Sequence, residues 1–126
     1  MRVWIVLPAY NEAENIQPMF EGFRKLVKNT YNLDLRVMII DDGSTDNTAA
    51  VAGTIAGDLT VQVLVNERNM GLAATLMRGL VEAARVAHAD DVIVCMDADN
   101  SHLPGQTLRL VPKQAYSPDR KVGQGT

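Results

Sequence analysis

The chain has 126 residues, of which 47% are hydrophobic and 21% are charged, so its length and composition fit one globular domain. Its formal net charge is −3 and its Lys and Arg residues form no cluster. Nucleic acid is therefore excluded as the expected partner, because a surface that follows nucleic-acid phosphates needs a basic stripe. The chain has one cysteine, Cys95, in an apolar run, which predicts a reduced, cytoplasmic protein with a buried thiol. The apolar run Val3 to Leu7 is too short for a secretory signal or a membrane span.

Four short apolar runs, rich in β-branched residues, predict four β-strands. They are Arg2–Leu7, which we expect to end at Pro8, then Leu35–Ile40, Val61–Val65 and Val92–Met96. The runs are continuous and do not alternate with polar residues, which is typical of strands that are buried on both faces of a sheet.

The segments between these runs have the spacing of amphipathic helices. We expect Asn11 to cap the first helix, with Glu14 as its reciprocal partner, and Ser44 or Thr45 to cap the second. The third helix is expected from about Leu72 to Ala87. The apolar residues on one face of each helix are Ile16, Phe20, Phe23 and Val27 in the first, Ala49, Ala52, Ile55 and Ala56 in the second, and Leu72, Leu76, Leu80 and Ala83 or Ala84 in the third.

Strands and helices that alternate at this spacing predict an α/β fold, with an open, mostly parallel, doubly wound sheet and helices on both faces, as in Rossmann-like domains. Pro104–Pro112 is expected to form a short helix. Lys113–Thr126 is polar, rich in Gly and Pro and without periodicity. We therefore expect one domain over residues 1–112, followed by a polar tail over residues 113–126 that is disordered or foreign to the fold.

Polar residues follow each of the four predicted strands. These segments are Pro8–Glu12, Asp41–Asp46, Asn66–Leu72 and Asp97–His102. In open parallel sheets, ligands bind outside the carboxyl ends of the strands, where all four segments are expected to lie. The sequence therefore predicts a functional site at this edge of the sheet.

Asp97 and Asp99 leave the last predicted strand with one residue between them. Residues i and i+2 of an extended segment point the same way, so both carboxylates can face one ion. Two adjacent carboxylates repel unless a cation neutralises them, and hard oxygen ligands suit Mg²⁺ or Mn²⁺. The structural alternative is that one aspartate caps a helix while the other lies in a solvated turn.

Asp41 and Asp42 also have two interpretations. Either carboxylate can accept a hydrogen bond from a nucleobase or a ribose hydroxyl, or it can cap the turn and helix that follow. Gly43, directly after them, permits a positive φ and a close approach of the backbone.

Two further loops carry candidates. Tyr10 can stack on a base, or it can simply pack on the surface. Arg68 and Gly71 lie where a cation and the N-terminus of a helix can meet a phosphate, although Arg68 is equally compatible with a solvated loop residue. His102 can contact a metal or a phosphate, but a lone histidine is more often neither.

Four segments together resemble the inverting family-two glycosyltransferases with the GT-A fold, especially the dolichyl- and polyprenyl-phosphate mannose or glucose synthases. The segments are LPAYNEAENI (7–16), IIDDGSTDNT (39–48), ERNMGLAATLMRGL (67–80) and VCMDADNSH (94–102). They occur in the order and spacing of that family and cover Val3 to about Pro112. One such segment can arise by chance, whereas four in series are specific.

The resemblance implies a role for each matching residue. Pro8, Tyr10 and Glu12 would line the nucleobase pocket, and Asp42, beside Asp41, would bind the base or its ribose. Gly71 and Leu72, near Arg68, would lie beside the ribose and phosphates. Asp97 would contact the ribose and the ion, and Asp99 would bind the ion, Mg²⁺ or Mn²⁺. Ser101 replaces a residue, often Gln, that is a further metal ligand in some relatives.

The resemblance also implies a reaction. The donor would be a UDP- or GDP-linked sugar, and the ion would stabilise the departing nucleoside diphosphate. The acceptor, a polyprenyl phosphate, would attack the anomeric carbon from the opposite face and invert it. A cytoplasmic location follows, with peripheral binding at the inner face of the membrane where a lipid acceptor is used.

Family members continue into a second half that holds the acceptor site and any catalytic base. We therefore expect this chain to be truncated, to bind nucleotide without turnover, and to form homo-oligomers through an uncovered sheet edge and apolar surface. The alternatives are a non-catalytic nucleotide-binding or assembly module, and a receiver-like signalling domain, whose acidic pair would follow the first strand. A nicotinamide-dependent oxidoreductase is excluded because Pro8–Glu12 contains no glycine, and a P-loop NTPase because no Gly-Lys-Ser/Thr occurs.

Overall fold

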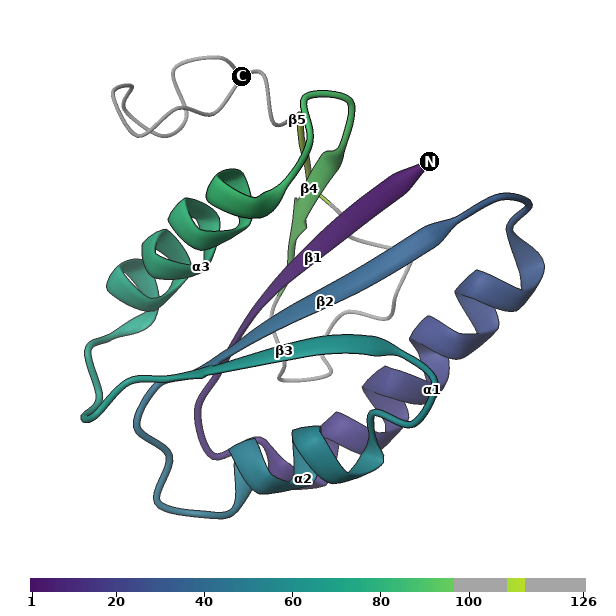
Figure 1. Ribbon diagram of the computed structural model, residues 1–126. Helices are drawn as coiled ribbons and strands as arrows, with labels where there is room; N and C mark the ends of the chain where they lie inside the picture. Colours follow the sequence, from purple (N-terminus) through teal and green to yellow (C-terminus); the bar gives the residue numbers. More distant parts are fainter. Residues whose placement is uncertain (97–108, 113–126) are drawn as a thin grey trace.

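A five-stranded sheet forms the centre of the molecule in the computed structural model, which describes residues 1–96 and 109–112 (Figure 1). The strands are β1 (Arg2–Ala9), β2 (Asp34–Asp41), β3 (Thr60–Val65), β4 (Val92–Cys95) and β5 (Arg109–Pro112). Their order across the sheet is β3-β2-β1-β4-β5. The pairs among the first four strands are parallel, and β5 is antiparallel to β4. The α/β prediction is confirmed, but the helix predicted up to Pro112 is wrong over Arg109–Pro112, which is a strand.

Three helices cover the two faces of the sheet (Figure 1). They are α1 (Ala13–Asn29), α2 (Thr48–Ile55) and α3 (Leu72–Val86). Apolar residues of α1 and α2 form one core cluster with one face of the strands, and α3 forms a second cluster with the other face. Successive residues of a strand point to opposite faces, so strands between two helical layers have to be apolar throughout. None of the helices within the described residues has the length and apolar character that crossing a membrane requires.

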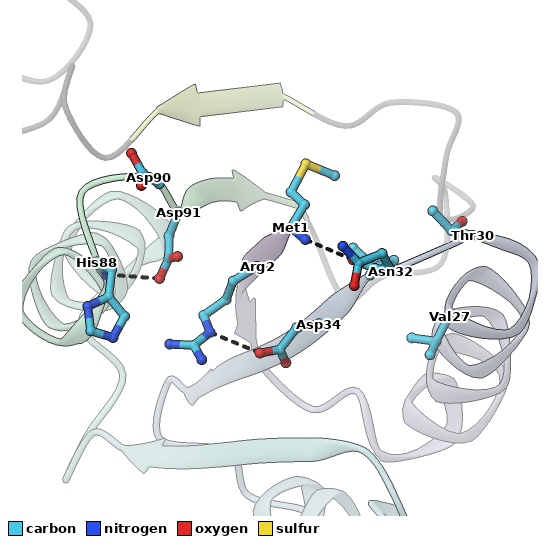
Figure 2. Close-up of a pocket in the computed structure, with 10 residues that line it drawn as sticks. Met1, Arg2, Val27, Thr30, Asn32, Asp34, His88, Asp90 and Asp91 are labelled. Carbon is cyan, nitrogen blue, oxygen red and sulfur yellow. Dashed lines mark hydrogen bonds and ion pairs between the residues drawn. The ribbon is translucent and has the colours of Figure 1, made fainter.

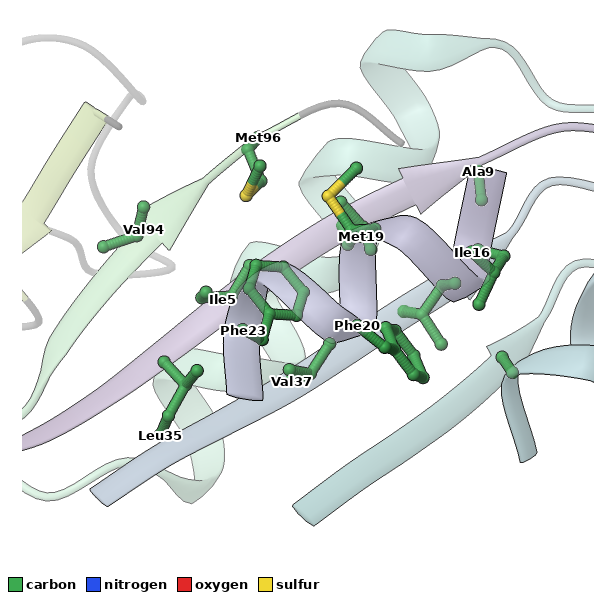
Figure 3. Packing of buried hydrophobic residues seen from close by; sticks show 13 residues of the cluster. Ile5, Ala9, Ile16, Met19, Phe20, Phe23, Leu35, Val37, Val94 and Met96 are labelled. Atoms are coloured by element: carbon green, nitrogen blue, oxygen red, sulfur yellow. The ribbon is translucent and has the colours of Figure 1, made fainter. Parts of the chain in front are cut away.

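The core on the α1 side is built around two phenylalanines (Figure 3). Phe20 and Phe23 are completely buried, with their ring centroids 6.1 Å apart. They pack with Ile5 of β1 and Val37 of β2 in the same cluster. The helical stripe predicted from sequence is confirmed here, because Ile16 is buried as well and Val27 packs against the cluster.

The buried stripe of α3 differs from the prediction at its first turn. Leu72 was expected to face the sheet, but it is 61% exposed, and Thr75 is buried in its place. Thr75 faces inward because its hydroxyl accepts a hydrogen bond from the side-chain amide of Asn66, 3.0 Å away. Further along, a Cβ at Gly79 would lie 2.5 Å from side-chain carbons of Ile40 and Val6, so α3 lies very close to the sheet.

Pro8 does not end β1 as predicted, because the strand continues to Ala9. Pro8 pairs with Ile40 of β2, and its own main-chain groups point to the opposite side, toward β4. On that side the amide of Met96 donates a hydrogen bond to the carbonyl of Val6, at 3.1 Å. Proline has no amide hydrogen, and the side on which it cannot donate is the one that faces β4, so the ladder to β2 is not interrupted.

Candidate functional site

Three loops leave the carboxyl ends of β1, β2 and β3 side by side. The register sets this arrangement: Ala9 at the end of β1 pairs with Asp41 at the end of β2, and Asp41 pairs with Val65 at the end of β3. Loops 10–12, 42–47 and 66–71 therefore begin at the same edge of the sheet, as the sequence predicted.

Asn11 joins the first loop to the second. Its backbone has a φ of +52°, and its side-chain carbonyl accepts hydrogen bonds from the amides of Thr45 (2.8 Å) and Asp46 (3.3 Å). Its own amide donates to the hydroxyl of Ser44 at 2.9 Å. The predicted helix caps are therefore wrong. Asn11, Ser44 and Thr45 bind one another across the two loops, and no side-chain cap bond is made by Glu12 or Asn47, the residues that precede α1 and α2.

Asp46 connects the beginnings of these two helices. Its carboxylate accepts hydrogen bonds from the amide of Ala13, the first residue of α1 (3.3 Å), and from the amide of Thr48, the first residue of α2 (3.0 Å). The hydrogen bond from the Thr48 hydroxyl is the largest cause of a lowered pKa at Asp46, ahead of the opposing effect of burial. No motif in the sequence distinguished Asp46 from the other polar residues of its loop.

Asp42 holds the third loop. One carboxylate oxygen accepts hydrogen bonds from the amide of Met70 (2.7 Å) and the side-chain amide of Asn66 (2.9 Å), and the other accepts one from the amide of Gly71 (3.0 Å). Only 5% of Asp42 is exposed. Burial alone would raise its pKa, but the hydrogen bonds from Met70, Asn66, Thr75 and Gly71 outweigh burial and lower the pKa below its ordinary value of 3.8.

Asn66 extends this network to α3. Its side-chain amide donates to both Asp42 and Thr75, and its side-chain carbonyl accepts a hydrogen bond from Arg78 at 2.6 Å. Sequence reasoning placed Asn66 in a polar segment of the site without a role of its own, and it missed Thr75 and Arg78. A polar residue directly after a buried strand was the available signal for Asn66, whereas Thr75 and Arg78 lie inside a helix and carry no such signal.

Gly43 lies where the second and third loops meet. Its φ is +68°, and a Cβ at this position would lie 2.5 Å from the carbonyl carbon of Arg68 and from the amide nitrogen of Asn69. The positive φ and the close approach predicted from sequence are both confirmed. The group that approaches the glycine is the backbone of the neighbouring loop.

The predicted contact residues differ in how accessible they are. Tyr10 is 43% exposed, and Leu72 and Arg68 are exposed as well. Glu12 is half-buried and accepts a hydrogen bond from the side-chain amide of Asn15. Asp41 is 5% exposed and accepts a hydrogen bond from the amide of Ser44 at 3.0 Å. All of them lie along one edge of the sheet with Pro8 and Gly71.

The predicted metal ligands Asp97 and Asp99 lie outside the described residues, as do Ser101 and His102. The described chain reaches Met96, whose amide bonds to β1 at the same carboxyl edge. In the part of the chain that the structure describes, no group of three or more His, Cys, Asp or Glu residues could hold a metal ion.

Among the surface hollows of the described residues, two lie at opposite ends of the sheet. One of about 490 Å³, beside β3 and α3, is lined by Val65, Asn66, Glu67, Arg68, Met70 and Arg78. The other, of about 560 Å³, lies at the amino ends of the strands and is lined by residues that include Arg2, Asp34, His88 and Asp91 (Figure 2). The described lining of this second hollow includes none of the predicted site residues, so the first is the one associated with the candidate site.

The chain belongs to glycosyl transferase family 2, whose family model matches residues 4–122. This match runs past residue 112. The family match also excludes the alternative that the chain is a receiver-like signalling domain, and it places the chain in a family of enzymes.

Three curated relatives illustrate the similarity. The chain is 29% identical to a dolichol-phosphate mannosyltransferase from Pyrococcus furiosus over 98% of its own length and 33% of the relative's. It is 35% identical to an undecaprenyl-phosphate 4-deoxy-4-formamido-L-arabinose transferase from Sodalis glossinidius, with 94% and 35% covered. It is 32% identical to a polyprenol monophosphomannose synthase from Mycolicibacterium smegmatis, with 97% and 44% covered. The chain therefore spans between a third and a half of the length of these relatives.

Solved structures agree with the fold. A mannosyltransferase from Pyrobaculum calidifontis, in complex with GDP-Man and Mn²⁺, matches with a TM-score of 0.59 and 28% identity over 78% of this chain and 27% of that one. A glucosyl-3-phosphoglycerate synthase from Mycobacterium tuberculosis, in complex with Mn²⁺, UDP and glucosyl-3-phosphoglycerate, matches with a TM-score of 0.54 and 26% identity over 77% and 33%. The α/β arrangement described above is thus that of known glycosyltransferases.

Proposed function

We propose that this chain is the donor-binding half of an inverting glycosyltransferase that transfers a sugar from a UDP- or GDP-linked donor to a polyprenyl phosphate. Family membership supports the transferase class, and the names of the three curated relatives support the lipid-phosphate acceptor. The observation that carries the proposal is that three loops are joined to one another at the carboxyl edge of the sheet. Asn11 and Asp42 fix three loops to one another, which gives a donor a rigid surface before it binds.

Each part of this edge suits one part of the donor. Pro8, Tyr10 and Glu12, at the end of β1, would line the nucleobase pocket, and the exposed ring of Tyr10 is available to stack on the base. Asp42, beside Asp41 at the end of β2, would accept a hydrogen bond from the base or the ribose. These contacts would set the orientation of the nucleoside.

The third loop suits the phosphates. Helix α3 begins at Leu72 without a side-chain cap, so its first amides remain available to an anion. The guanidinium of Arg68, three residues before Gly71, adds a positive charge at the same end of the helix. We propose that Arg68, Gly71 and Leu72 contact the ribose and the diphosphate.

Asp97 and Asp99 would hold Mg²⁺ or Mn²⁺, with Asp97 also contacting the ribose. The donor set fits such an ion, since two carboxylates supply hard oxygen ligands and leave positions for phosphate oxygens. When bound, the ion neutralises the charge that develops on the departing diphosphate. An acceptor phosphate is already anionic, so its attack on the anomeric carbon needs little help from a base.

Calorimetry of the 126-residue chain with GDP and UDP, with and without Mn²⁺, tests the proposal. We expect one of the two nucleotides to bind only when Mn²⁺ is present, and Asp99→Asn to abolish this metal dependence. Binding that ignores the metal, or equal weak binding of ATP, GDP and UDP, would contradict it. A transfer assay with a donor sugar and a polyprenyl phosphate separates the enzyme from a non-catalytic binding module. We expect the 126-residue chain to bind nucleotide and to transfer no sugar alone, because it spans at most 44% of these relatives.

We further propose that the chain forms homo-oligomers through β3. This strand lies at the edge of the sheet, and its sequence TVQVLV contains no charge and no proline, the usual protections of a free edge. The amides of Val61 and Val63 point away from β2, because the ladder to β2 uses the alternate residues up to Asn66. Val63→Pro removes only an outward donor, so it should give monomers in sedimentation experiments while the wild type forms dimers. A wild type that is monomeric at all concentrations would contradict this proposal.

A further inference from the structure

We infer that Arg78 is a positioning residue for the nucleotide site: it fixes the side chain of Asn66, and Asn66 fixes the carboxylate of Asp42. This inference rests on the proposed function, in which Asp42 accepts a hydrogen bond from the base or the ribose. Arg78 acts through Asn66 and does not itself contact the nucleotide. It lies in the second turn of α3, outside the residues to which the family resemblance gives a role.

The side chain of Asn66 lies between a group that only accepts hydrogen bonds and a group that only donates them. Its nitrogen donates to the carboxylate of Asp42 at 2.9 Å, and its oxygen accepts from the guanidinium of Arg78 at 2.6 Å. An ionised carboxylate has no proton to donate, and a guanidinium has no lone pair with which to accept. Turning the amide over would therefore set oxygen against oxygen at Asp42 and N–H against N–H at Arg78. The two partners together fix the orientation of Asn66.

The two ends of this chain of hydrogen bonds carry opposite charges. The carboxylate of Asp42 is negative and the guanidinium of Arg78 is positive, so the amide of Asn66 bridges an anion and a cation. Hydrogen bonds in such a chain polarise one another, and a cation at the oxygen of an amide makes its nitrogen a stronger donor. Arg78 should therefore strengthen the hydrogen bond by which Asn66 holds Asp42.

The bridge is buried at the point where it meets Asp42. Asn66 is 8% exposed, and its nitrogen also donates to the hydroxyl of Thr75, which is 1% exposed, at 3.0 Å. A buried amide oxygen that loses its donor bears the full cost of its desolvation, so without Arg78 the side chain of Asn66 should move to find another partner. The carboxylate of Asp42 would shift with it, because the oxygen that accepts from Asn66 also accepts from the amide of Met70.

Arg78 reaches this buried bridge from the surface. It is exposed and lines the hollow beside β3 and α3. The described lining of that hollow includes Asn66 but not Asp42, so Arg78 meets the bridge at its outer end. A substitution at Arg78 can therefore remove the cation while the buried side chains of Asn66 and Asp42 are kept.

Proton exchange of the Asn66 side-chain amide, measured by NMR in the 126-residue chain without nucleotide, tests the first step. Its nitrogen donates to both Asp42 and Thr75, so we expect slow exchange in the wild type. Arg78→Met should accelerate this exchange about tenfold, because the amide loses the donor that orients it. Arg78→Lys keeps a charged donor and should hold the rate within about twofold of the wild type. Exchange that is unchanged in Arg78→Met would overturn the inference.

Nucleotide affinity then tests whether Arg78 acts through the bridge. In calorimetry with Mn²⁺ and the nucleotide that the wild type binds, GDP or UDP, Arg78→Met should raise the Kd about tenfold, and Arg78→Lys should restore most of the loss. Arg85→Met is the matched control, because Arg85 lies on the same helix and pairs with Glu82, and it should change the Kd by less than about twofold.

A second background separates positioning from direct contact. In Asn66→Ala the bridge is already broken, so adding Arg78→Met should weaken binding no further. If Asn66→Ala does not fold, Asp42→Asn serves as the second background with the same expectation. The same loss of affinity in both backgrounds would overturn the inference and make Arg78 a direct contact of the nucleotide. If the wild type binds neither nucleotide, the proposed function fails, whereas exchange at Asn66 still decides whether Arg78 fixes this side chain.

Discussion

The two ends of the parallel sheet are both rich in polar residues, but these residues have different partners at each end. At the carboxyl end, side chains bind backbone amides: Asn11 holds the amides of the second loop, Asp42 those of the third, and Asp46 the first amides of α1 and α2. Each of these side chains therefore determines the path of a loop.

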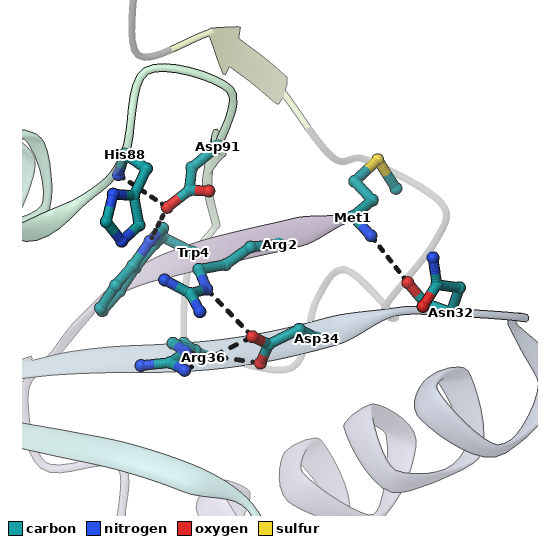
Figure 4. Close-up of polar contacts among 8 residues, drawn as sticks. All are labelled: Met1, Arg2, Trp4, Asn32, Asp34, Arg36, His88 and Asp91. Atoms are coloured by element: carbon teal, nitrogen blue, oxygen red, sulfur yellow. Dashed lines mark hydrogen bonds and ion pairs between the residues drawn. The ribbon is translucent and has the colours of Figure 1, made fainter.

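At the amino end, side chains mostly bind one another (Figure 4). Asp34 pairs with Arg2 at 2.9 Å and with Arg36 at 3.4 Å, and the guanidinium of Arg36 lies 5.6 Å from the ring centre of Trp4. The indole N–H of Trp4 donates to Asp91 at 2.9 Å. Opposite charges meet here within the sheet, and they leave little unpaired charge for a ligand.

This difference shows how the same residue types give a binding edge or a structural edge. A carboxylate paired with a guanidinium is neutralised by a side chain, so it stabilises the strands and adds little else. A carboxylate that binds loop amides fixes a backbone conformation, and the loop can then present other groups. The hollow at the amino end is therefore a poor candidate for the donor site.

The largest expected effect on stability comes from replacing one glycine at each end of the sheet with alanine. Gly43 at the carboxyl end and Gly57 at the amino end have φ values of +68° and +57°, so alanine is strained at both. At Gly43 the new Cβ would also lie 2.5 Å from backbone atoms of Arg68 and Asn69, which cannot move without the loop. We expect Gly43→Ala to lower the free energy of unfolding by about 3 kcal/mol, and Gly57→Ala by about 1 kcal/mol.

Urea unfolding of both variants measures this difference. The comparison is valid when the m-values of the variants equal that of the wild type. The neighbour of Gly57 is the guanidinium of Arg24 at 3.2 Å, the far end of a flexible side chain that can shift. Equal losses of stability in the two variants would show that the carboxyl loops are no more tightly joined than the amino ones. Exchange at Met70 should increase only in Gly43→Ala.

The fold was predictable from sequence because it depends on burial, whereas the site depends on loop geometry. The apolar runs located β1 to β4 to within two residues at each end, and the spacing in α1 identified Phe20 and Phe23 as core. The roles of Asn11 and Ser44 were wrong, since a residue that can cap its own helix can equally bind a neighbouring loop. Which of these occurs depends on how the strands place the loops, and that register is not a local property.

The second prediction tests the amino end by removing Asp91. Its carboxylate accepts hydrogen bonds from the indole of Trp4 and the amide of His88, both at 2.9 Å, and only 7% of the residue is exposed. Asp91→Ala leaves a buried indole N–H without a partner, so we expect a loss of about 2 kcal/mol in the free energy of unfolding. The adjacent exposed Asp90 is the control, and Asp90→Ala should change the free energy of unfolding by less than about 0.5 kcal/mol. Nucleotide affinity should be unchanged in both variants, and weaker binding in Asp91→Ala would break the comparison.

Lowering the pH should destabilise the contacts at both ends of the sheet over the same pH range. Burial alone would raise the pKa of Asp42 and of Asp91, but their hydrogen bonds, with those from Met70 and from Trp4 the largest, and for Asp91 nearby charges as well, together outweigh it, and both pKa values fall below 3.8. A carboxyl group with a lowered pKa in the folded state contributes stability above its unfolded value, and this stability is lost as the pH falls through the folded value. The free energy of unfolding should therefore be flat near neutral pH and decrease below about pH 4. Fluorescence of Trp4, the one tryptophan of the chain, reports on the amino end, and exchange at Met70 reports on the carboxyl end.

The smallest effect is expected for the ion pair of Arg2 and Asp34. Their side chains are 28% and 44% exposed, so solvent and salt screen the 2.9 Å contact, and Arg36 still pairs with Asp34 when Arg2 is removed. We expect Arg2→Gln to lower the free energy of unfolding by about 0.5 kcal/mol, and this loss should nearly disappear in 1 M NaCl. A double-mutant cycle with Asp34→Asn isolates the pair from the effect of either residue alone. Nucleotide affinity is the sharper measurement, since the amino end is assigned no contact with the donor. A change in Kd with Arg2→Gln that exceeds its small effect on stability would mean that the two ends of the sheet are coupled, and the hollow between Arg2 and His88 would then have to be considered again as a ligand site.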